Sequence, residues 1–384
     1  MTKHETHKKE PLMHISKRMD MKNWQAWLIR LGAFAIALIV CGIVSSILKP
    51  GSFGKFYAYL FKGVFGTPRR IWLLLQNIAM LLCVALAVTP AFKMKFWNIG
   101  AEGQVLMGAL MCALCMFYMG GKAANGVIVL VCFIASMAMG AIWAVIPALF
   151  KAQWNTNETL FTLMMNYVAM NLVRFCVNKW STNGSGVLGI LQYGWMPSIG
   201  KYTYLLNIII VAVLTVLLWV YLRFSKHGYE LTVVGESTNT ARYIGINIKK
   251  VIIRTMILSG VICGIAGFLL VSGTSHTVNA NLADGRGFTA ILVSWLAHFN
   301  PAAMALTSSL VVFLDQGSTF AGDSFRLGGS FSDIITGIFF FFIIASEFFI
   351  NYKVKLRAIS KKKEKALAEA VAVAAVEVTE EEVR

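Results

Sequence analysis

Charged residues are scarce in this sequence: Asp, Glu, Lys and Arg make up 14% of its 384 residues, and hydrophobic residues make up 57%. A soluble domain carries about 25% charged residues, so an ordinary soluble protein is excluded. The alternation of polar and apolar residues that marks barrel strands is also missing, and the apolar runs are long and continuous. Because only helices and closed barrels satisfy their backbone polar groups in a bilayer, the composition predicts an all-α polytopic membrane protein.

Sequence motifs of enzymatic chemistry are missing as well. His, Cys, Asp and Glu nowhere cluster at metal-ligand spacing, and no G-x-S-x-G nucleophile motif is present. The stretch nearest to a phosphate-binding loop, "GWMPSIGKY", has the wrong spacing and no Ser or Thr after Lys201. We therefore expect no catalytic residue, no metal site, no bound cofactor and no ATP hydrolysis in this chain.

The cysteines do not form a redox or metal framework. Cys112 and Cys115 have redox-like spacing, but they lie within an apolar run and no basic neighbour stabilises a thiolate there. We interpret all seven as small buried hydrophobic residues. They are Cys41, Cys83, Cys112, Cys115, Cys132, Cys176 and Cys263.

Ten apolar segments approach the roughly 20 residues that a membrane span needs. The eighth is short and ends at "HFNP", where Pro301 interrupts the helix, so we interpret it as half of a broken or re-entrant pair. Residues 49–70 are basic, which indicates an interfacial helix or an additional span near 53–66. The ten segments are 24–48, 71–92, 97–120, 125–150, 159–179, 204–223, 250–272, 286–298, 301–317 and 332–351.

The net charge of +17 gathers beside these segments. Cytoplasmic loops carry an excess of Lys and Arg, and ten crossings return the chain to its starting side, so both termini are expected in the cytoplasm. Anionic lipid headgroups then account for the charge, and nucleic acid is not expected as a partner. The predicted regions are a basic N-terminal tail at 1–23, a transmembrane domain at 24–351 with a long loop at 224–249, and a charged C-terminal tail at 352–384.

The loop at 224–249 contains the signals of a short helix. Gly228 is expected to break the chain, the Ser-Thr-Asn cluster at 237–239 can cap a helix that starts at Thr240, and Gly245 closes it. This helix is suited to docking against a soluble partner, or alternatively to lying at the membrane interface against lipid. Its docking side chains would be Glu236, Ala241, Arg242, Tyr243 and Ile244.

The stretch "NIGAEGQ" places a carboxylate between two glycines in apolar surroundings. Gly100 and Gly103 allow the backbone to bend, and Asn98 and Gln104 can satisfy freed backbone groups. Glu102 has three open roles: a brace hydrogen-bonded to a broken helix, a substrate contact, or a solvated residue at the cytoplasmic interface. As a brace, it should tolerate replacement by Gln and should not tolerate replacement by Leu.

Other polar and aromatic residues also occur within or beside the spans. Asn166 is suited either to bridging helices or to contacting a ligand. Trp295, Phe299 and Asn300 offer rings and an amide that suit a base or a sugar, while packing or interfacial anchoring is the alternative. Asn157 is a good N-cap for the fifth span.

Three segments together carry a family resemblance: "FWNIGAEGQVLMGA", "NETLFTLMMNYVA", and "GESTNTARYIGINIKKVIIRTMILSGVICGIAGFLL" followed by "GRGFTAILVSWLAHFNP". Over about 70–350 the chain resembles the permease subunits of bacterial ABC importers for nucleosides and simple sugars, of the branched-chain-amino-acid/ribose type. It is most similar to the longer of the two permeases in nucleoside systems. It departs from the family at Ser294, Trp295, Ala297 and His298, beside the substrate path.

The resemblance implies the fold of an ABC importer permease in the bacterial cytoplasmic membrane. It implies a separate ATPase subunit that binds ATP and magnesium, a second permease subunit in a heterodimer, and a substrate-binding lipoprotein. The substrate-path residues would be Asn98, Glu102, Gln104, Asn166, Trp295, Phe299 and Asn300. The residues of the ATPase-coupling segment would be Gly235, Glu236, Ala241, Arg242, Tyr243, Gly245 and Asn247.

Two other classes of function stay open on the sequence alone. An ion-coupled secondary transporter for a small polar solute would need an ion relay, and only isolated carboxylates are visible. A scaffold or a membrane enzyme is disfavoured because the chemical motifs are missing.

Overall fold

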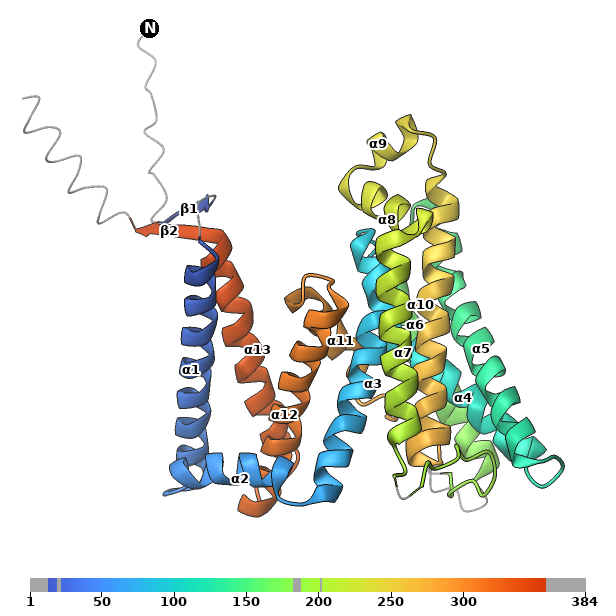
Figure 1. Ribbon diagram of the computed structural model, residues 1–384, viewed down its shortest axis with the longest axis horizontal. Helices are drawn as coiled ribbons and strands as arrows, with labels where there is room; N and C mark the ends of the chain where they lie inside the picture. The colour runs from blue at the N-terminus through green and yellow to red at the C-terminus, as the bar shows by residue number, and fades with distance from the viewer. Residues whose placement is uncertain (1–12, 19–21, 182–187, 201, 357–384) are drawn as a thin grey trace, which may run out of the picture. The chain divides into compact units, whose positions relative to one another are not determined.

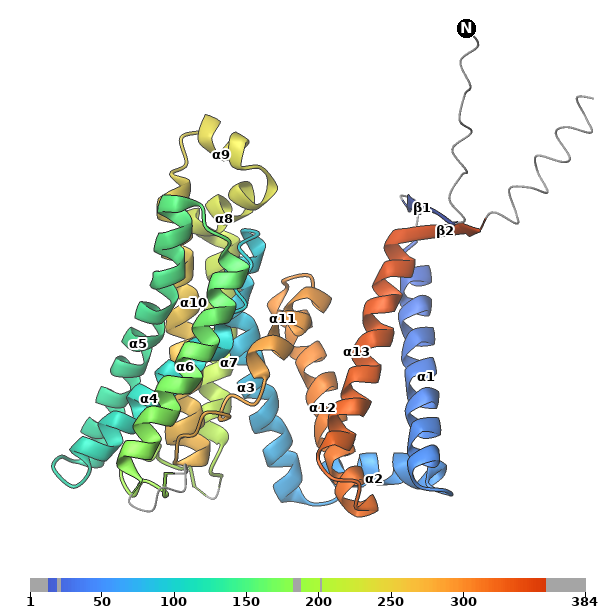
Figure 2. The same ribbon diagram turned by 180° about the vertical axis from the view of Figure 1, so that it is seen from behind.

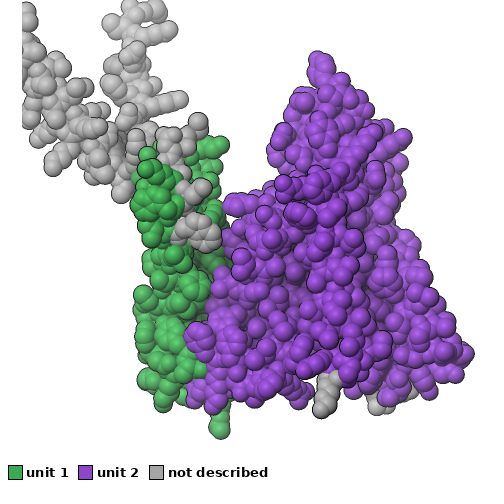
Figure 3. Space-filling view, viewed as in Figure 1, with its two compact units in different colours: residues 1–58, 322–384 green, residues 59–321 purple. Residues whose placement is uncertain are grey.

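The computed structural model describes residues 13–18, 22–181, 188–200 and 202–356. The chain divides into two compact units, which Figure 3 shows in different colours: unit 1 comprises residues 1–58 and 322–384, and unit 2 comprises residues 59–321. Figure 1 labels the elements in chain order. They are β1 (Met13–Lys17), α1 (Asn23–Leu48), α2 (Phe53–Phe65), α3 (Pro68–Lys93), α4 (Ala101–Met119), α5 (Asn125–Trp154), α6 (Glu158–Trp180), α7 (Leu205–Phe224), α8 (Lys226–Glu236), α9 (Thr238–Tyr243), α10 (Ile248–Leu270), the π-helix η1 (Val271–Ser275), α11 (Arg286–Leu296), α12 (Pro301–Phe325), α13 (Ser330–Asn351) and β2 (Tyr352–Leu356).

Eight helices of the described chain are long and apolar enough to cross a membrane. They match eight of the ten predicted segments and confirm the polytopic helical class. The eighth predicted segment is α11, whose 11 residues rise about 16 Å and cannot cross a 30 Å hydrocarbon layer. The ninth is α12, a helix of 25 residues that contains Asp315, Gln316 and Asp323 and is not among these eight. His298 and Phe299 both have positive φ, and this break separates α11 from Pro301.

The basic stretch between the first two spans contains α2, a helix of 13 residues. This length is too short for a span, which favours the interfacial interpretation over an additional crossing. Its buried side chains Phe56, Leu60 and Val64 recur at four-residue intervals, while Lys55 and Lys62 are exposed. The pattern is that of a helix with one apolar face and one face in contact with water or headgroups.

α10 occupies the centre of unit 2, where it packs against α3, α4 and α5 (Figures 1 and 2). Glycines allow this close approach. A Cβ atom on Gly140 of α5 would collide with the carbonyl oxygen of Gly260 of α10, and one on Gly264 would collide with that of Ser136. Small residues at helix contacts let backbones come together where lipid supplies no hydrophobic driving force. Six of the seven cysteines are buried, as predicted, whereas Cys176 is half-buried and departs from the prediction.

In unit 1, α1 and α13 pack together, and Arg30 forms an ion pair with Glu347 at 2.8 Å. The ends of this helix pair bring the flanking segments into an antiparallel ribbon, in which Met13 pairs with Leu356 and Lys17 with Tyr352. The predicted tails 1–23 and 352–384 therefore each contribute one strand to a short ribbon, in which the backbone groups of 13–17 pair with those of 352–356. Residues 1–12, 19–21 and 357–384 of these tails lie outside the described residues.

Candidate functional site

Glu102 lies in the first turn of α4 and is only 3% exposed, which contradicts a solvated interfacial role. Its Oε1 atom accepts a hydrogen bond from the backbone N–H of Gly285 at 2.9 Å, and its Oε2 atom accepts one from Gly287 at 2.7 Å. Gly285, with φ +68°, is the residue that precedes α11. The carboxylate therefore holds the N-terminus of α11, where the helix dipole favours negative charge. This geometry matches the bracing interpretation.

Three amide side chains hold the irregular stretch that leads into α4. Asn98 Oδ1 accepts hydrogen bonds from the Gly100 N–H at 3.0 Å and from Gln104 Nε2 at 3.3 Å, and Asn98 Nδ2 donates to Ser259 Oγ of α10 at 3.3 Å. Asn166 of α6 accepts from the Gly103 N–H at 2.8 Å and donates to the Ile99 carbonyl at 2.9 Å. All three amides are buried. With Glu102 they form what we call the polar brace: Asn98, Glu102, Gln104 and Asn166.

The other three residues predicted for the substrate path lie at the opposite end of α11. Trp295 is 49% exposed, and its ring lies 5.3 Å from that of Trp97. Phe299 is half-buried in the break before α12. Asn300 Oδ1 accepts a hydrogen bond from the Ala302 N–H at 3.1 Å and so caps α12. The structure thus gathers the four residues of the polar brace and leaves these three outside it.

The predicted loop helix is present, together with a second helix before it. Ser237 Oγ accepts from the Thr240 N–H at 3.2 Å and caps α9, and Gly245 closes the segment at φ +80°. Gly228 is not a breaker, because it lies inside the first turn of α8, where Ser225 Oγ accepts from its N–H at 3.0 Å. A Cβ atom on Gly228 would collide with the carbonyl of Leu222, so this glycine permits the tight passage from α7 into α8.

Two residues of the predicted ATPase-coupling set are buried instead. Ala241 of α9 is fully buried, and its carbonyl accepts a hydrogen bond from the Ile246 N–H at 2.9 Å. Gly235 is also buried, and a Cβ atom there would collide with the carbonyl of Lys93 at the end of α3. Tyr243, by contrast, is 93% exposed. The exposed members of the predicted set are Glu236, Arg242, Tyr243, Gly245 and Asn247.

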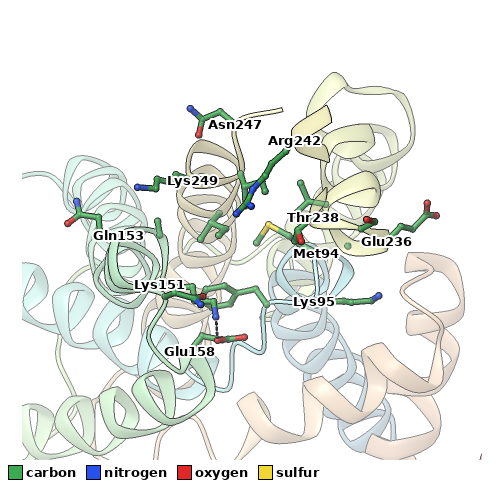
Figure 4. Close-up of a pocket in the computed structure, with 18 residues that line it drawn as sticks. Met94, Lys95, Lys151, Gln153, Glu158, Glu236, Thr238, Arg242, Asn247 and Lys249 are labelled. Atoms are coloured by element: carbon green, nitrogen blue, oxygen red, sulfur yellow. Dashed lines mark ion pairs between the residues drawn. The ribbon is translucent and has the colours of Figure 1, made fainter. Parts of the chain in front are cut away.

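A cleft of about 1000 Å³ opens beside α9, and we call it the α9 cleft (Figure 4). Its walls are the turn after α3, the α5–α6 turn, the α8–α9 segment and the start of α10. Lys151 and Glu158, on two sides of the α5–α6 turn, form an ion pair at 2.9 Å. The charged residues of the lining are Lys95, Lys151, Glu158, Glu236, Arg242 and Lys249.

Residues 70–344 match the protein family described as "Branched-chain amino acid transport system / permease component". The chain belongs to this family. It is a multi-pass membrane protein and the permease subunit of an ABC importer, which works with an ATPase and a substrate-binding protein. As a permease it carries out translocation and is not itself an enzyme.

Several permeases are similar to it over most of their length. The guanosine ABC transporter permease protein NupP of Bacillus subtilis (strain 168) is 26% identical over 332 residues, which cover 84% of this chain and 92% of NupP. The glucose ABC transporter permease protein TsgB13 of Haloferax volcanii is 26% identical over 362 residues, covering 89% and 93%. The nucleoside ABC transporter permease protein NupB of Lactococcus lactis subsp. cremoris is 25% identical over 276 residues, covering 68% and 76%.

The sequence did not reveal how this permease attaches its α8–α9 segment to the bundle. His227 is buried, its Nδ1 atom lies 2.8 Å from the Tyr221 hydroxyl on α7, and its Nε2 atom lies 3.3 Å from Thr255 Oγ1 on α10. Burial, and then the nearby charge of Arg254, lower the pKa of His227 below its ordinary value. A lone histidine in a basic loop gives no signal for such a contact, because both partners come from other helices.

A second polar cluster surrounds η1 and was also missed. Gln76 Nε2 donates to Thr274 Oγ1 at 2.7 Å, and the amide of Asn207 lies directly against Gly273. The ring of His276 stacks on Trp195 at 4.0 Å. Single π-helical turns are frequent at functional sites. The available signal was polar residues within apolar runs, as with Asn207 in "LLNIII". Among the described residues, no three His, Cys, Asp or Glu side chains could hold a metal ion.

Proposed function

We propose that this permease translocates nucleosides, with simple sugars as the second substrate class, after delivery by an extracytoplasmic binding lipoprotein. The observation that carries the proposal is the similarity to a guanosine permease over 84% of the chain. A nucleoside permease of a second bacterium supports the same class. The glucose permease is equally identical at 26%, which is why sugars remain the second class.

Substrate competition tests this proposal. Vesicles containing the complete importer should take up a radiolabelled nucleoside in the presence of ATP, and unlabelled nucleosides should compete better than pentoses or hexoses. Uptake should stop when ATP is depleted and should survive dissipation of ion gradients. Strong competition by sugars alone would assign the second class, and dependence on an ion gradient would point to a secondary transporter.

We further propose that the permease lies in a bacterial cytoplasmic membrane, with both termini and the α9 end of unit 2 in the cytoplasm, and that a different permease chain completes a heterodimer. The excess of Lys and Arg near the α9 end supports the orientation. Resemblance to the longer permease of two-permease systems supports the heterodimer. Mass spectrometry of the purified importer should find two permease chains of different mass, and a single permease mass would contradict the heterodimer.

The ATPase is proposed to dock on residues 235–247, which we call the coupling segment. Support comes from its capped helix α9, the exposed Tyr243, and the rigid seat that buried Gly235 and Ala241 provide. Replacing Tyr243 by Ala should weaken co-purification of the ATPase and lower uptake. Tyr118→Ala is the matched control, since Tyr118 is 53% exposed in the last turn of α4, and the α4–α5 turn lies at the opposite end of unit 2 from α9 (Figure 1). Equal ATPase yield for the two variants would exclude Tyr243 as a contact.

A further inference from the structure

The α9 cleft carries an excess of positive charge. Four cationic and two acidic side chains line it, and the Lys151–Glu158 ion pair removes one of each sign. Within the described part of the chain, Arg242 and Lys249 have no ion-pair partner. Figure 4 shows the Arg242 guanidinium directed into the cleft and the Glu236 carboxylate directed away from it. The lining therefore carries more cations than acids, and Arg242 is the cation that is directed into the cleft.

The backbone adds to this potential. α6 and α10 both begin at the cleft, capped by Asn157 and Asn247, and the N-terminus of a helix carries a partial positive charge of about half an elementary charge. The first turn of α6 already carries Glu158, whereas that of α10 carries no acidic residue, so the α10 end and the unpaired cations favour an anionic occupant. A planar base finds no platform in the lining, because the one aromatic side chain there, Phe96, is buried.

The walls of the cleft indicate where the anion comes from. One wall is the coupling segment itself, from Gly235 to Asn247, and the cleft is wide enough to admit several side chains. A protein that docks on the exposed Tyr243 would also reach the cleft, whereas a small free anion in the cleft would make no contact with Tyr243. Complementary charge at a contact steers association and fixes register.

We propose that the α9 cleft receives an acidic segment of the ATPase subunit, whose carboxylates pair with Arg242 and Lys249. The inference rests on the proposed docking of the ATPase and extends it: the contact has two parts, the projecting α9 and the cationic cleft beside it. In this interface the permease therefore both projects α9 toward the ATPase and accepts an ATPase segment in its own α9 cleft.

Adjacent lysines of α10 provide the test. Lys249 lines the cleft, whereas Lys250 is exposed in the same first turn and does not line it. Lys249→Glu and Lys250→Glu both replace a lysine by a glutamate in the first turn of α10, and of these two positions only 249 lines the cleft. The permease complex would be placed in nanodiscs without anionic lipid, and binding of purified, nucleotide-free ATPase would be measured at low and high salt.

Lys249→Glu should weaken ATPase binding at least tenfold at low salt, and Lys250→Glu should change it less than twofold. The difference should shrink in 0.5 M salt, where charges are screened over roughly 4 Å. A cysteine at position 249 should cross-link to the ATPase next to an Asp or Glu, and changing that residue to Lys should restore binding to Lys249→Glu.

Equal binding of the two variants would overturn the proposal, as would a Lys249→Glu defect seen only in nanodiscs with anionic lipid or only with ATP present. A defect that requires anionic lipid would assign the cleft to a lipid headgroup, and a defect that requires ATP would assign it to a nucleotide phosphate. If Tyr243→Ala still weakens binding while Lys249→Glu does not, the docking of the coupling segment stands and only the cleft inference fails.

Discussion

Glu102 shows how one buried side chain can join distant parts of this fold. Its two carboxylate oxygens accept hydrogen bonds from backbone groups 183 and 185 residues away, and the residue is only 3% exposed. The neighbouring amides of the polar brace do the same for the irregular stretch before α4. Because both of its oxygens are engaged, we interpret Glu102 as a structural brace, and we expect substitution there to be more severe than the sequence suggested.

Replacing Glu102 by Gln should destabilise the permease by about 1 to 3 kcal/mol, because the amide keeps one acceptor and turns an NH₂ group toward an N–H donor. The sequence alone predicted a mild effect. Glu102→Leu leaves both N–H donors without a partner and should cost roughly twice as much. Thermal unfolding in detergent measures both variants, and a Glu102→Leu protein with wild-type stability and uptake would rule out the brace.

His227 gives the protein a specific pH dependence. Its pKa in the folded state is lowered, mainly by burial and secondarily by Arg254, with Glu230 acting in the opposite direction. The unfolded chain therefore binds more protons at this site as the pH falls, so the stability that neutral His227 contributes is complete above about pH 6.5 and is lost below it. Between pH 7 and pH 5 the melting temperature should fall more for the wild type than for His227→Gln. Parallel curves would contradict this assignment.

Among the helices, α10 is the one on which unit 2 depends most. It is the most buried of the candidate spans, and glycines at its contacts with α5 bring the two backbones together. It also carries Ser259 to the polar brace and Thr255 to His227. A displacement of α10 would therefore move the coupling segment, the polar brace and η1 together.

Gly140→Ala should destabilise the permease by about 1 to 3 kcal/mol, because its Cβ would meet the Gly260 carbonyl and force α5 and α10 apart. Gly126→Ala is the matched control in the same helix, since nothing lies within 4 Å of a Cβ built there. That change should be neutral or slightly stabilising, because Ala favours helix over Gly. A Gly140→Ala melting temperature equal to that of Gly126→Ala would show that the contact adapts without strain.

The arrangement of unit 2 places α8 and α9 at one end and the α4–α5 turn at the other (Figures 1 and 2). The sequence-based topology predicts labelling of positions 237 and 360 only from the cytoplasm and of position 184 only from outside, but 184 and 360 lie outside the described residues. Ser237 is a half-buried helix cap, so the exposed Tyr243 is the better probe of the α9 end. Lys122, exposed in the α4–α5 turn, probes the opposite end.

In a cysteine-free background, a cysteine at position 243 should react with an impermeant reagent only from the cytoplasmic side. A cysteine at position 122 should react only from the outside. The reason is that α5, with 30 residues, is long enough to separate the two ends by the thickness of a membrane. Labelling of both positions from the same side would overturn the topology.

The sequence by itself determined the membrane class, eight of the spans and the caps of α6 and α9, because hydropathy and capping are properties of adjacent residues. Asn157 and Ser237 cap the helices beside them. Only the tertiary structure decided that Ala241 faces inward, that Met13 pairs with Leu356, and that Glu102 binds the start of α11. In each of these cases the partner is on another element. A local pattern records that a side chain needs burial or a hydrogen bond, but the packing of distant helices decides which residue supplies it.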